Sequence, residues 1–388
     1  MKNIGFLLNF PVEYKGGINY FKNLFYAIHK YHSEEVQIIL FVPSDLANEY
    51  VDSFSPYTKL VKTKILQRKT LPWMVSKVGE KYFNFDPLVY SLLRKHRIDY
   101  ISHSNYVYPF KDIKTINWIP DFQYLHYPHL STKKQYHYTT SLHKRLIEKS
   151  DSIILSSKSA LSDYMEVYAQ FSEKVEVLNF VSQPTQGIKT SLLKTEKIDI
   201  YNRYNITKDF FYLPNQFWTH KNHISVFKAI KILKDQGYDP LLITSGHMKD
   251  FRNDNSHITN LRNMVESNGL TNNILFLGLI PYNDVINLMI LAKCIINPSF
   301  FEGWSSTVEE ARTMGKKMLL SNIDVHLEQN PPNAVYFDPN NELELAEKMK
   351  DILEENQQDE QFDLVYLQKS LDDRTQKFAL EYLKILDK

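Results

Sequence analysis

Two glutamates flank a short turn that precedes a helix in the second half of the chain. Glu302 and Glu310 stand eight residues apart within segment 297–315, which follows the apolar run 288–296. That run predicts a helix followed by a short buried strand. The two carboxylates therefore lie on either side of the turn between this strand and the next helix, where both can accept hydrogen bonds from hydroxyl groups.

The helix after the turn is predicted over residues 307–314. Ser306 and Glu309 have the spacing of a capping box, and Gly315 can take the left-handed conformation that ends a helix. The unpaired N–H groups at such a helix start attract phosphate. Two hydroxyl-binding carboxylates around an anion site suit a nucleoside diphosphate that carries a sugar at one end and a ribose at the other.

This pattern resembles the Glu-x7-Glu motif of retaining GT-B glycosyltransferases, in particular family 4, the glycosyltransferase group 1 type. The resemblance implies that Glu302 contacts hydroxyls of the donor sugar and that Glu310 contacts the ribose. Two glutamates at this spacing also occur by chance in an acidic helix start. Three further stretches follow the family in the same order, however, so the resemblance extends over nearly the whole chain.

The first stretch, 211–233, predicts a short strand and then a helix, which places Lys221 at a loop-to-helix junction. An ammonium group there can neutralise a diphosphate. Most relatives carry an arginine five residues earlier, where this chain has Gln216. The departure leaves Lys221, helix N-termini and neutral amides to stabilise the leaving group. His220 and His223 flank Lys221 and are interpreted as exposed or packing histidines.

The second stretch is the amino terminus, where a strand, a loop ending in Gly16 and Gly17, and an amphipathic helix follow one another. In the family that it resembles, paired glycines let the backbone approach the donor phosphates. Neither a G-x-G-x-x-G nor a G-x-x-x-x-G-K-[ST] sequence occurs, so dinucleotide and P-loop interpretations lack sequence support.

The third stretch, 116–128, resembles the segment after an inner strand of the family's first domain. Many relatives have His-Asp where this chain has Pro120 and Asp121. Asp121 could orient an acceptor hydroxyl, and His126 could lie nearby. A capping aspartate and a packing histidine explain the two residues equally well.

The resemblance implies a site made of three groups of residues. The expected catalytic residues are Lys221, Glu302 and Asp121, and the expected acceptor-side residue is His126. The expected donor-binding residues are Gly16, Gly17, Asn215, Gln216, Lys221, Gly303, Trp304, Ser305, Ser306 and Glu310. No Asp-x-Asp sequence stands in the matching region, so we expect neither a metal nor another cofactor.

Strands and helices are predicted to alternate from residue 1 to about 182 and again from about 209 to 338, which indicates an α/β fold with parallel sheets. The GT-B resemblance implies two Rossmann-like domains whose sheets face a central cleft. The expected parts are an acceptor-binding domain over 1–182, a linker over 183–208, a donor-binding domain over 209–370, and a helix over 371–388 that crosses back to the first domain.

Composition fits this interpretation. The chain carries 46 Lys plus Arg against 45 Asp plus Glu, which gives no global electrostatic case for nucleic acid. The lone Cys294 excludes an intrachain disulfide and suits a reducing compartment. The apolar run 4–10 is too short for a signal peptide, and no 18-residue apolar span occurs. We therefore expect a cytoplasmic protein.

One segment has a strong local charge. Segment 59–81 holds seven basic residues and a single acid, Glu80, interleaved with apolar and aromatic residues. Such a segment can lie on an anionic bilayer, at the inner face of the plasma membrane. An ordinary solvated face with a packed apolar side is the alternative.

These observations predict a retaining, metal-independent glycosyltransferase. The expected donor is a UDP- or GDP-sugar, and the expected acceptor is a glycan or lipid-linked intermediate in bacterial surface polysaccharide synthesis, such as O-antigen or capsule. Two alternatives stay open: a nucleotide-sugar epimerase of the same architecture, and a non-catalytic sugar-nucleotide-binding protein, which Gln216 in place of arginine suggests.

Overall fold

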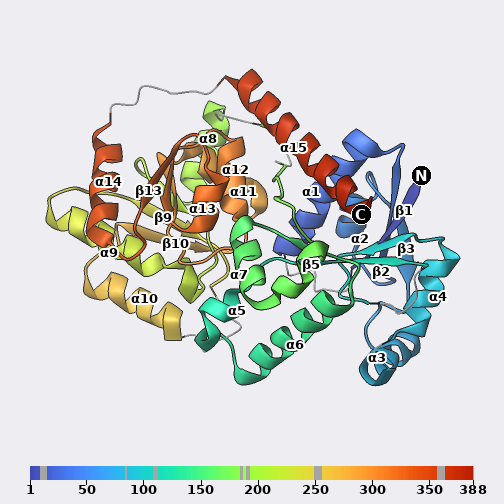
Figure 1. Ribbon diagram of the computed structural model, residues 1–388. Coiled ribbons are helices and arrows are strands. Elements are labelled where there is room, and N and C mark those ends of the chain that lie inside the picture. Colours follow the sequence, from blue (N-terminus) through green and yellow to red (C-terminus); the bar gives the residue numbers. More distant parts are fainter. Residues whose placement is uncertain are drawn as a thin grey trace. The chain divides into compact units, whose positions relative to one another are not determined.

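The structure, a computed structural model, describes residues 1–8, 15–83, 85–107, 112–183, 187–188, 193–248, 256–355 and 363–387. Contacts divide the chain into two compact units. The first comprises Met1–Phe122, Gln135–Val181 and Asp373–Lys388, and the second comprises Gln123–Lys134 and Ser182–Asp372. Figure 1 shows that helices flank a twisted sheet in each unit.

The first unit is built on a parallel sheet with the strand order β3-β2-β1-β4-β5-β6-β7. Its strands are β1 (Lys2–Leu7), β2 (Val36–Pro43), β3 (Lys59–Thr63), β4 (Tyr100–Ser102), β5 (Lys114–Ile119), β6 (Ser152–Leu155) and β7 (Val175–Val177). Its helices are α1 (Lys15–His32), α2 (Asn48–Phe54), α3 (Leu71–Phe83), α4 (Pro87–Lys95), most of α6 (Lys133–Lys149), α7 (Lys158–Tyr168) and the 3₁₀ helix η2 (Ala169–Lys174).

Both faces of this sheet are buried, as expected when crossover helices cover a parallel sheet. Successive side chains of a strand point to opposite faces. Phe6 of β1 therefore packs on α1, with ring centroids 5.5 Å from Phe21 and 4.8 Å from Phe25. Its neighbour Leu7 joins the cluster on the other face, which includes Leu93 of α4.

The second unit has a parallel sheet with the strand order β10-β9-β8-β11-β12-β13. Its strands are β8 (Phe211–Leu213), β9 (Leu242–Ser245), β10 (Ile274–Gly278), β11 (Cys294–Asn297), β12 (Met318–Ser321) and β13 (Ala334–Phe337). Its helices are α5 (Gln123–His126), η1 (Pro128–Leu130), α8 (Lys194–Arg203), η3 (Thr219–Lys221), α9 (His223–Asp235), α10 (Ser256–Ser267), α11 (Tyr282–Leu291), α12 (Ser306–Thr313), α13 (Asp324–Gln329), α14 (Glu342–Glu354) and the start of α15 (Leu364–Leu386).

Alternation along the strands divides the core of the second unit into two clusters. Cys294 and Ile296 of β11 join the cluster that holds α9, α10 and α14. Ile295, between them, joins the cluster that holds α8, α11 and α12. The strands are apolar on both faces, so they are rigid supports for the polar residues that follow their carboxyl ends.

The expected α/β fold with two parallel-sheet, Rossmann-like units is confirmed. Three local expectations differ from the structure. The expected linker 183–208 carries α8, whose buried Ile200 belongs to the core of the second unit. The last helix begins at Leu364 rather than residue 371. Gly16 and Gly17 do not end a loop, because α1 already begins at Lys15 and both glycines lie in its first turn.

No helix among the residues that the structure describes is long and apolar enough to span a membrane.

Candidate functional site

Polar residues gather where three neighbouring strands of the second unit end. Asn215 follows β8, Asn297 ends β11 and Ser321 ends β12, and all three are buried. Strands β8, β11 and β12 are adjacent and parallel, so their carboxyl ends meet at one edge of the sheet. In open α/β sheets this edge is where ligands bind.

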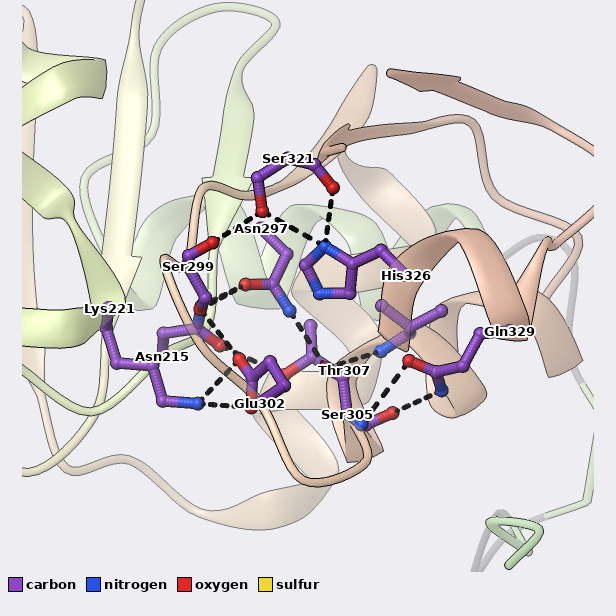
Figure 2. Close-up of polar contacts among 11 residues, drawn as sticks. Asn215, Lys221, Asn297, Ser299, Glu302, Ser305, Thr307, Ser321, His326 and Gln329 are labelled. Atoms are coloured by element: carbon purple, nitrogen blue, oxygen red, sulfur yellow. Dashed lines mark hydrogen bonds and ion pairs between the residues drawn. The ribbon is translucent and has the colours of Figure 1, made fainter. Parts of the chain in front are cut away.

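A buried ion pair lies at this edge. The Lys221 ammonium Nζ lies 2.7 Å from both Oε1 and Oε2 of Glu302. The two side chains are only 14% and 8% exposed, and Figure 2 shows the lysine reaching across to the loop after β11. Two of the residues expected to be catalytic are thus in direct contact.

Asn222 fixes the backbone next to Lys221. It has φ of 51°, a left-handed conformation that asparagine tolerates better than most residues, and it separates η3 from α9. Its Nδ2 donates to the backbone oxygens of Pro298 at 3.1 Å and Pro339 at 2.9 Å. Because Pro298 begins the loop that carries Glu302, Asn222 ties the lysine and the glutamate to one support.

The Glu302 carboxylate is held from its other side by Ser299. The Ser299 Oγ lies 2.6 Å from Glu302 Oε1 and 2.8 Å from Asn297 Oδ1, and its single proton can serve only one of them at a time. The hydroxyl of Ser321 donates to the Ser299 backbone oxygen at 2.6 Å. The loop is therefore anchored to both β11 and β12.

Glu302 is ionised in these surroundings. Burial acts to raise the pKa of its carboxyl, but the positive charge and hydrogen bonds of Lys221, with the hydrogen bond from Ser299, overcome it and hold the pKa below its usual value. A buried anion of this kind is a strong acceptor for the hydroxyls of a bound ligand.

A second network connects the strand ends to the start of α12. Asn215 Nδ2 donates to Asn297 Oδ1 at 2.9 Å, and Thr307 Oγ1 donates to Asn215 Oδ1 at 3.2 Å. Asn297 Nδ2 donates to Ser305 Oγ at 2.8 Å, and this same oxygen caps the helix through the Val308 N–H. The start of α12 is thus held by one side chain from β11 and one from the segment that follows β8 (Figure 2).

The helix cap differs from the expected one by a residue. Ser305, rather than Ser306, is the N-cap of α12, and Glu309 does not close a capping box. Gln329 of α13 instead binds the Ser305 backbone, with its Nε2 donating to the carbonyl at 3.0 Å and its Oε1 accepting from the N–H at 3.3 Å. Gln329 also donates to Glu309 at 3.1 Å. Gly315 ends the helix with φ of 65°, as predicted.

Glu310, one turn into α12, lies in a different environment from Glu302. Its Oε1 accepts a hydrogen bond from the Tyr282 hydroxyl at 2.8 Å. Burial raises the pKa of the Glu310 carboxyl to about 7, against the opposing effect of that hydrogen bond. The two glutamates therefore differ in charge near neutral pH, which suits two different hydroxyl-binding tasks.

His326 of α13 is a buried residue of this site that the sequence did not single out. Its Nδ1 lies 2.9 Å from the Ser321 carbonyl oxygen and 3.1 Å from the Ser321 hydroxyl. Nδ1 therefore carries the proton, and the buried Nε2 has no hydrogen-bond partner among the described residues. Burial lowers the pKa of His326 to about 4 despite the nearby Glu302 charge, so the ring is neutral.

Gly246 shapes the backbone under the site. A Cβ at this position would lie 2.4 Å from the backbone oxygen of Asn215, and its φ is 147°. Only glycine allows the chain after β9 to approach the loop after β8 so closely.

The remaining expected donor-site residues of this unit differ in exposure. Gly303 and Trp304 are half-buried, and Ser306 and Gln216 are exposed. His220 and His223 are both buried, so the expected packing role fits and the exposed alternative does not. The His223 ring stacks on Phe217 with centroids 4.3 Å apart.

The residues expected on the acceptor side fall in different units. His126 belongs to the second unit by its contacts, and its ring lies 5.3 Å from that of Phe301, the residue before Glu302. Asp121, Gly16 and Gly17 belong to the first unit. Asp121 is half-buried after β5.

A pattern in the sequence could have found the missed residues. Asn297 and Ser321 each follow a run of three apolar residues, and a polar residue at the end of a buried parallel strand marks the ligand-binding edge. His326 and Gln329 carry no comparable signal, since they depend on how α13 packs.

Part of the chain is similar in sequence to known proteins. Residues 195–364 match the family model of the glycosyl transferases group 1. The O-antigen chain mannosyltransferase RfbU of Salmonella typhimurium is 26% identical over 203 residues, which are 48% of this chain and 55% of the relative. The match thus spans about half the length of that curated relative.

Similar solved structures cover nearly the whole chain. Alr3699/HepE of Anabaena, in complex with UDP and glucose, has a TM-score of 0.70 at 13% identity and is covered over 100% of both chains. A glycosyltransferase of Rickettsia africae has a TM-score of 0.66 at 15% identity, over 99% of this chain and 98% of its own. WaaG, a glycosyltransferase involved in lipopolysaccharide biosynthesis, has a TM-score of 0.62 at 15% identity, over 97% and 95%.

The fold is that of the GT-B glycosyltransferases. The residues that match the glycosyl transferases group 1 model lie in the second unit, and they include the Lys221–Glu302 pair.

Proposed function

We propose that this protein is a retaining glycosyltransferase that moves a sugar from a UDP- or GDP-sugar to a glycan or lipid-linked acceptor in bacterial surface polysaccharide synthesis. The observation that carries the proposal is the buried contact of 2.7 Å between Lys221 and Glu302 beside the start of α12. A cation and a helix N-terminus at this sheet edge suit the negatively charged diphosphate of the donor, and the neighbouring carboxylate suits the hydroxyl groups of its sugar.

In the proposed mechanism, Lys221 and the N–H groups at the start of α12 stabilise the negative charge that develops on the departing diphosphate. Glu302 accepts hydrogen bonds from hydroxyls of the donor sugar and fixes its orientation. Glu310 accepts from the ribose. A diphosphate that enters takes over the Lys221 ammonium from Glu302, and this releases the carboxylate for the sugar.

The fixed charge of Lys221 takes the place that a metal ion has in other nucleotide-sugar sites, so we propose a metal-independent reaction. On the acceptor side, we propose that Asp121 orients the attacking hydroxyl and that His126, beside Phe301, lies near it. In the first unit, Gly16 and Gly17 lie in the first turn of α1, and we propose that their backbone N–H groups bind the donor phosphates.

The relatives support the choice of donor and process. Alr3699/HepE has been crystallised with UDP-glucose, which makes a uridine diphosphate sugar the first donor to test. RfbU is an O-antigen chain mannosyltransferase, which makes GDP-mannose the second. RfbU is named for the O-antigen chain and WaaG for lipopolysaccharide biosynthesis, and these names support the proposed role in surface polysaccharide synthesis.

Thermal unfolding with a panel of uridine and guanosine diphosphate sugars identifies the donor. A ligand at about 100 times its Kd adds roughly 2.7 kcal/mol of stability, which is easily measured. The stabilising donor, labelled in its sugar, is then incubated with free glycans and with lipid-linked glycans.

If the labelled sugar appears on a glycan, the result supports the proposed glycosyltransferase activity. An epimerised donor with no labelled glycan would favour the epimerase, and stabilisation without any turnover would favour the non-catalytic binding protein. Digestion of the product with glycosidases of known anomeric specificity tests retention.

A further inference from the structure

Helix α3 of the first unit turns its apolar side chains toward solvent. Leu71, Met74, Val75, Val78 and Tyr82, which we call the α3 stripe, are 46–70% exposed. Their spacing of three and four residues places them on one face of the helix. An apolar face of this kind on the surface of a protein marks an interaction site.

The side of α3 that packs on the protein includes two small residues, Ser76 and Gly79, which are buried. The Ser76 hydroxyl donates to the buried carboxylate of Asp86, the N-cap of α4. A Cβ on Gly79 would lie 2.9 Å from the Phe85 backbone oxygen, so the backbones approach closely there. The helix is therefore locked in a rotation that keeps the α3 stripe outside, the reverse of the usual amphipathic arrangement.

Basic side chains cluster at the start of α3. Lys62 lies near the end of β3, and Lys64, Arg68 and Lys69 lie in the segment that joins β3 to α3; all four are exposed, and we call them together the basic loop. None of the four forms an ion pair with another residue in the part of the chain that the structure describes. Their charges are therefore available to an anionic partner.

Thr70 connects the basic loop to the helix. Its Oγ1 lies 2.6 Å from the Lys64 backbone oxygen and 2.9 Å from that of Gln67. The same oxygen accepts from the Trp73 N–H at 3.3 Å in the first turn of α3. Thr70 thus holds the segment that contains Lys64 and Gln67 against the first turn of α3.

We propose that the α3 stripe and the basic loop bind the surface of an anionic lipid bilayer, with α3 lying in the interface. Apolar side chains of an interfacial helix enter the headgroup region while basic groups meet the charged headgroups. The positive charge of the loop favours this occupant over a second copy of the chain, which would bring the same four cations to the contact. The proposal does not depend on the proposed transferase function, because binding is tested without any nucleotide.

Co-sedimentation with vesicles tests the surface. The wild type should bind vesicles that contain phosphatidylglycerol but not those of phosphatidylcholine alone, and added salt should weaken the binding. Replacing the basic loop (Lys62→Gln, Lys64→Gln, Arg68→Gln and Lys69→Gln together) should weaken it by more than about tenfold.

Two triple variants test whether vesicle binding depends on the α3 stripe or on any exposed apolar side chains. Leu71→Ser, Val75→Ser and Val78→Ser together should also weaken binding by more than about tenfold. The matched control, with Ile198→Ser, Leu343→Ser and Val365→Ser, removes apolar groups of the second unit that are 46%, 62% and 71% exposed and should bind like the wild type. Circular dichroism melting verifies that each variant is folded.

A site-specific label reports where the bilayer touches. The single native cysteine, Cys294, is buried, so a Val78→Cys variant can be labelled selectively with an environment-sensitive dye. Its emission should shift to the blue with anionic vesicles, whereas a dye on Leu343→Cys should not respond. Normal vesicle binding by the stripe variant, equal binding to neutral vesicles, or an unresponsive dye at position 78 would overturn the proposal. The proposal would also be overturned if the wild type formed a dimer in solution and the serine substitutions in the α3 stripe, but not those of the control, made it monomeric.

Discussion

The Lys221 ammonium donates to both carboxylate oxygens of Glu302 at 2.7 Å, and neither side chain is more than 14% exposed. A buried pair is costly to break from one side, because the remaining charge is left without compensation. The ion pair therefore stabilises the second unit. In the proposed mechanism, the donor diphosphate must also separate Lys221 from Glu302 when it binds.

A double-mutant cycle measures the coupling energy between Lys221 and Glu302. Lys221→Met and Glu302→Gln should each reduce the free energy of unfolding, by roughly 3–5 kcal/mol at most. The double variant should lose about 2–3 kcal/mol less than the sum of the two, as measured by urea unfolding. The exposed pair Lys228–Glu342, with side chains 47% and 34% exposed, is the control and should show a coupling below about 1 kcal/mol. Similar coupling in both pairs would show that burial does not govern the contact.

The two glutamates should affect ligands differently. In the proposed mechanism, Glu302→Gln weakens an acceptor for sugar hydroxyls, whereas Glu310→Gln weakens an acceptor for the ribose. Isothermal calorimetry with the bare nucleoside diphosphate should therefore give the larger loss of affinity for Glu310→Gln. Equal losses, or the reverse order, would mean that the two roles have been exchanged or misassigned.

Glu310 should also make nucleotide binding depend on pH. Its pKa of about 7 means that the better acceptor, the ionised form, becomes populated as the pH rises from 6 to 8. Affinity should rise by up to about tenfold over this range. Glu310→Gln is the control, since it keeps the titration of the nucleotide itself and loses only that of the carboxyl. An identical pH profile in wild type and variant would contradict this origin.

The raised pKa of Glu310 has an effect on stability as well. The folded value lies above the ordinary value of 4.5, so the unfolded chain ionises first. The folded protein therefore loses stability as the pH rises from about 4.5 to about 7. This loss should be absent from the unfolding curves of Glu310→Gln.

Gly246 should be among the most sensitive small residues near the site. Gly246→Ala places a Cβ 2.4 Å from the Asn215 backbone oxygen, so we expect a loss of roughly 2–4 kcal/mol in unfolding free energy together with weaker nucleotide binding. Gly237→Ala is matched, because its φ of 89° is also positive but no atom lies within 4 Å of the added Cβ. That variant should lose only about 1–2 kcal/mol and bind normally. If Gly246→Ala and Gly237→Ala lost equal amounts of unfolding free energy, the positive φ alone, and not the close contact with Asn215, would explain the loss.

Much of the fold follows from local patterns in the sequence. Apolar runs such as 294–296 and 318–320 are short, and they form most of the buried strands β11 and β12. The junction at Lys221 and the helix end at Gly315 were likewise predictable, because each depends on residues close in sequence. The start of α12 was missed by one residue, since Ser305 and Ser306 are both good caps and tertiary contacts with Gln329 select the first.

The supports of the site were less predictable. The family resemblance indicated Lys221 and Glu302 separately, but their direct contact joins residues 81 positions apart and depends on the packing of β8 beside β11. The outward rotation of α3 is similar, because sequence periodicity identifies an apolar stripe without saying which way it faces. Only the contacts of Ser76 and Gly79 fix that direction.

The most direct test of the account is the rate of sugar transfer by Lys221→Ala, measured with the donor that stabilises the wild type most and at saturating donor and acceptor. If Lys221 neutralises the leaving diphosphate, its loss should raise the barrier by roughly 2–4 kcal/mol, which lowers turnover about 30- to 1,000-fold. Lys228→Ala, on the exposed face of α9, should transfer at the wild-type rate. Transfer by Lys221→Ala at the wild-type rate would contradict the account.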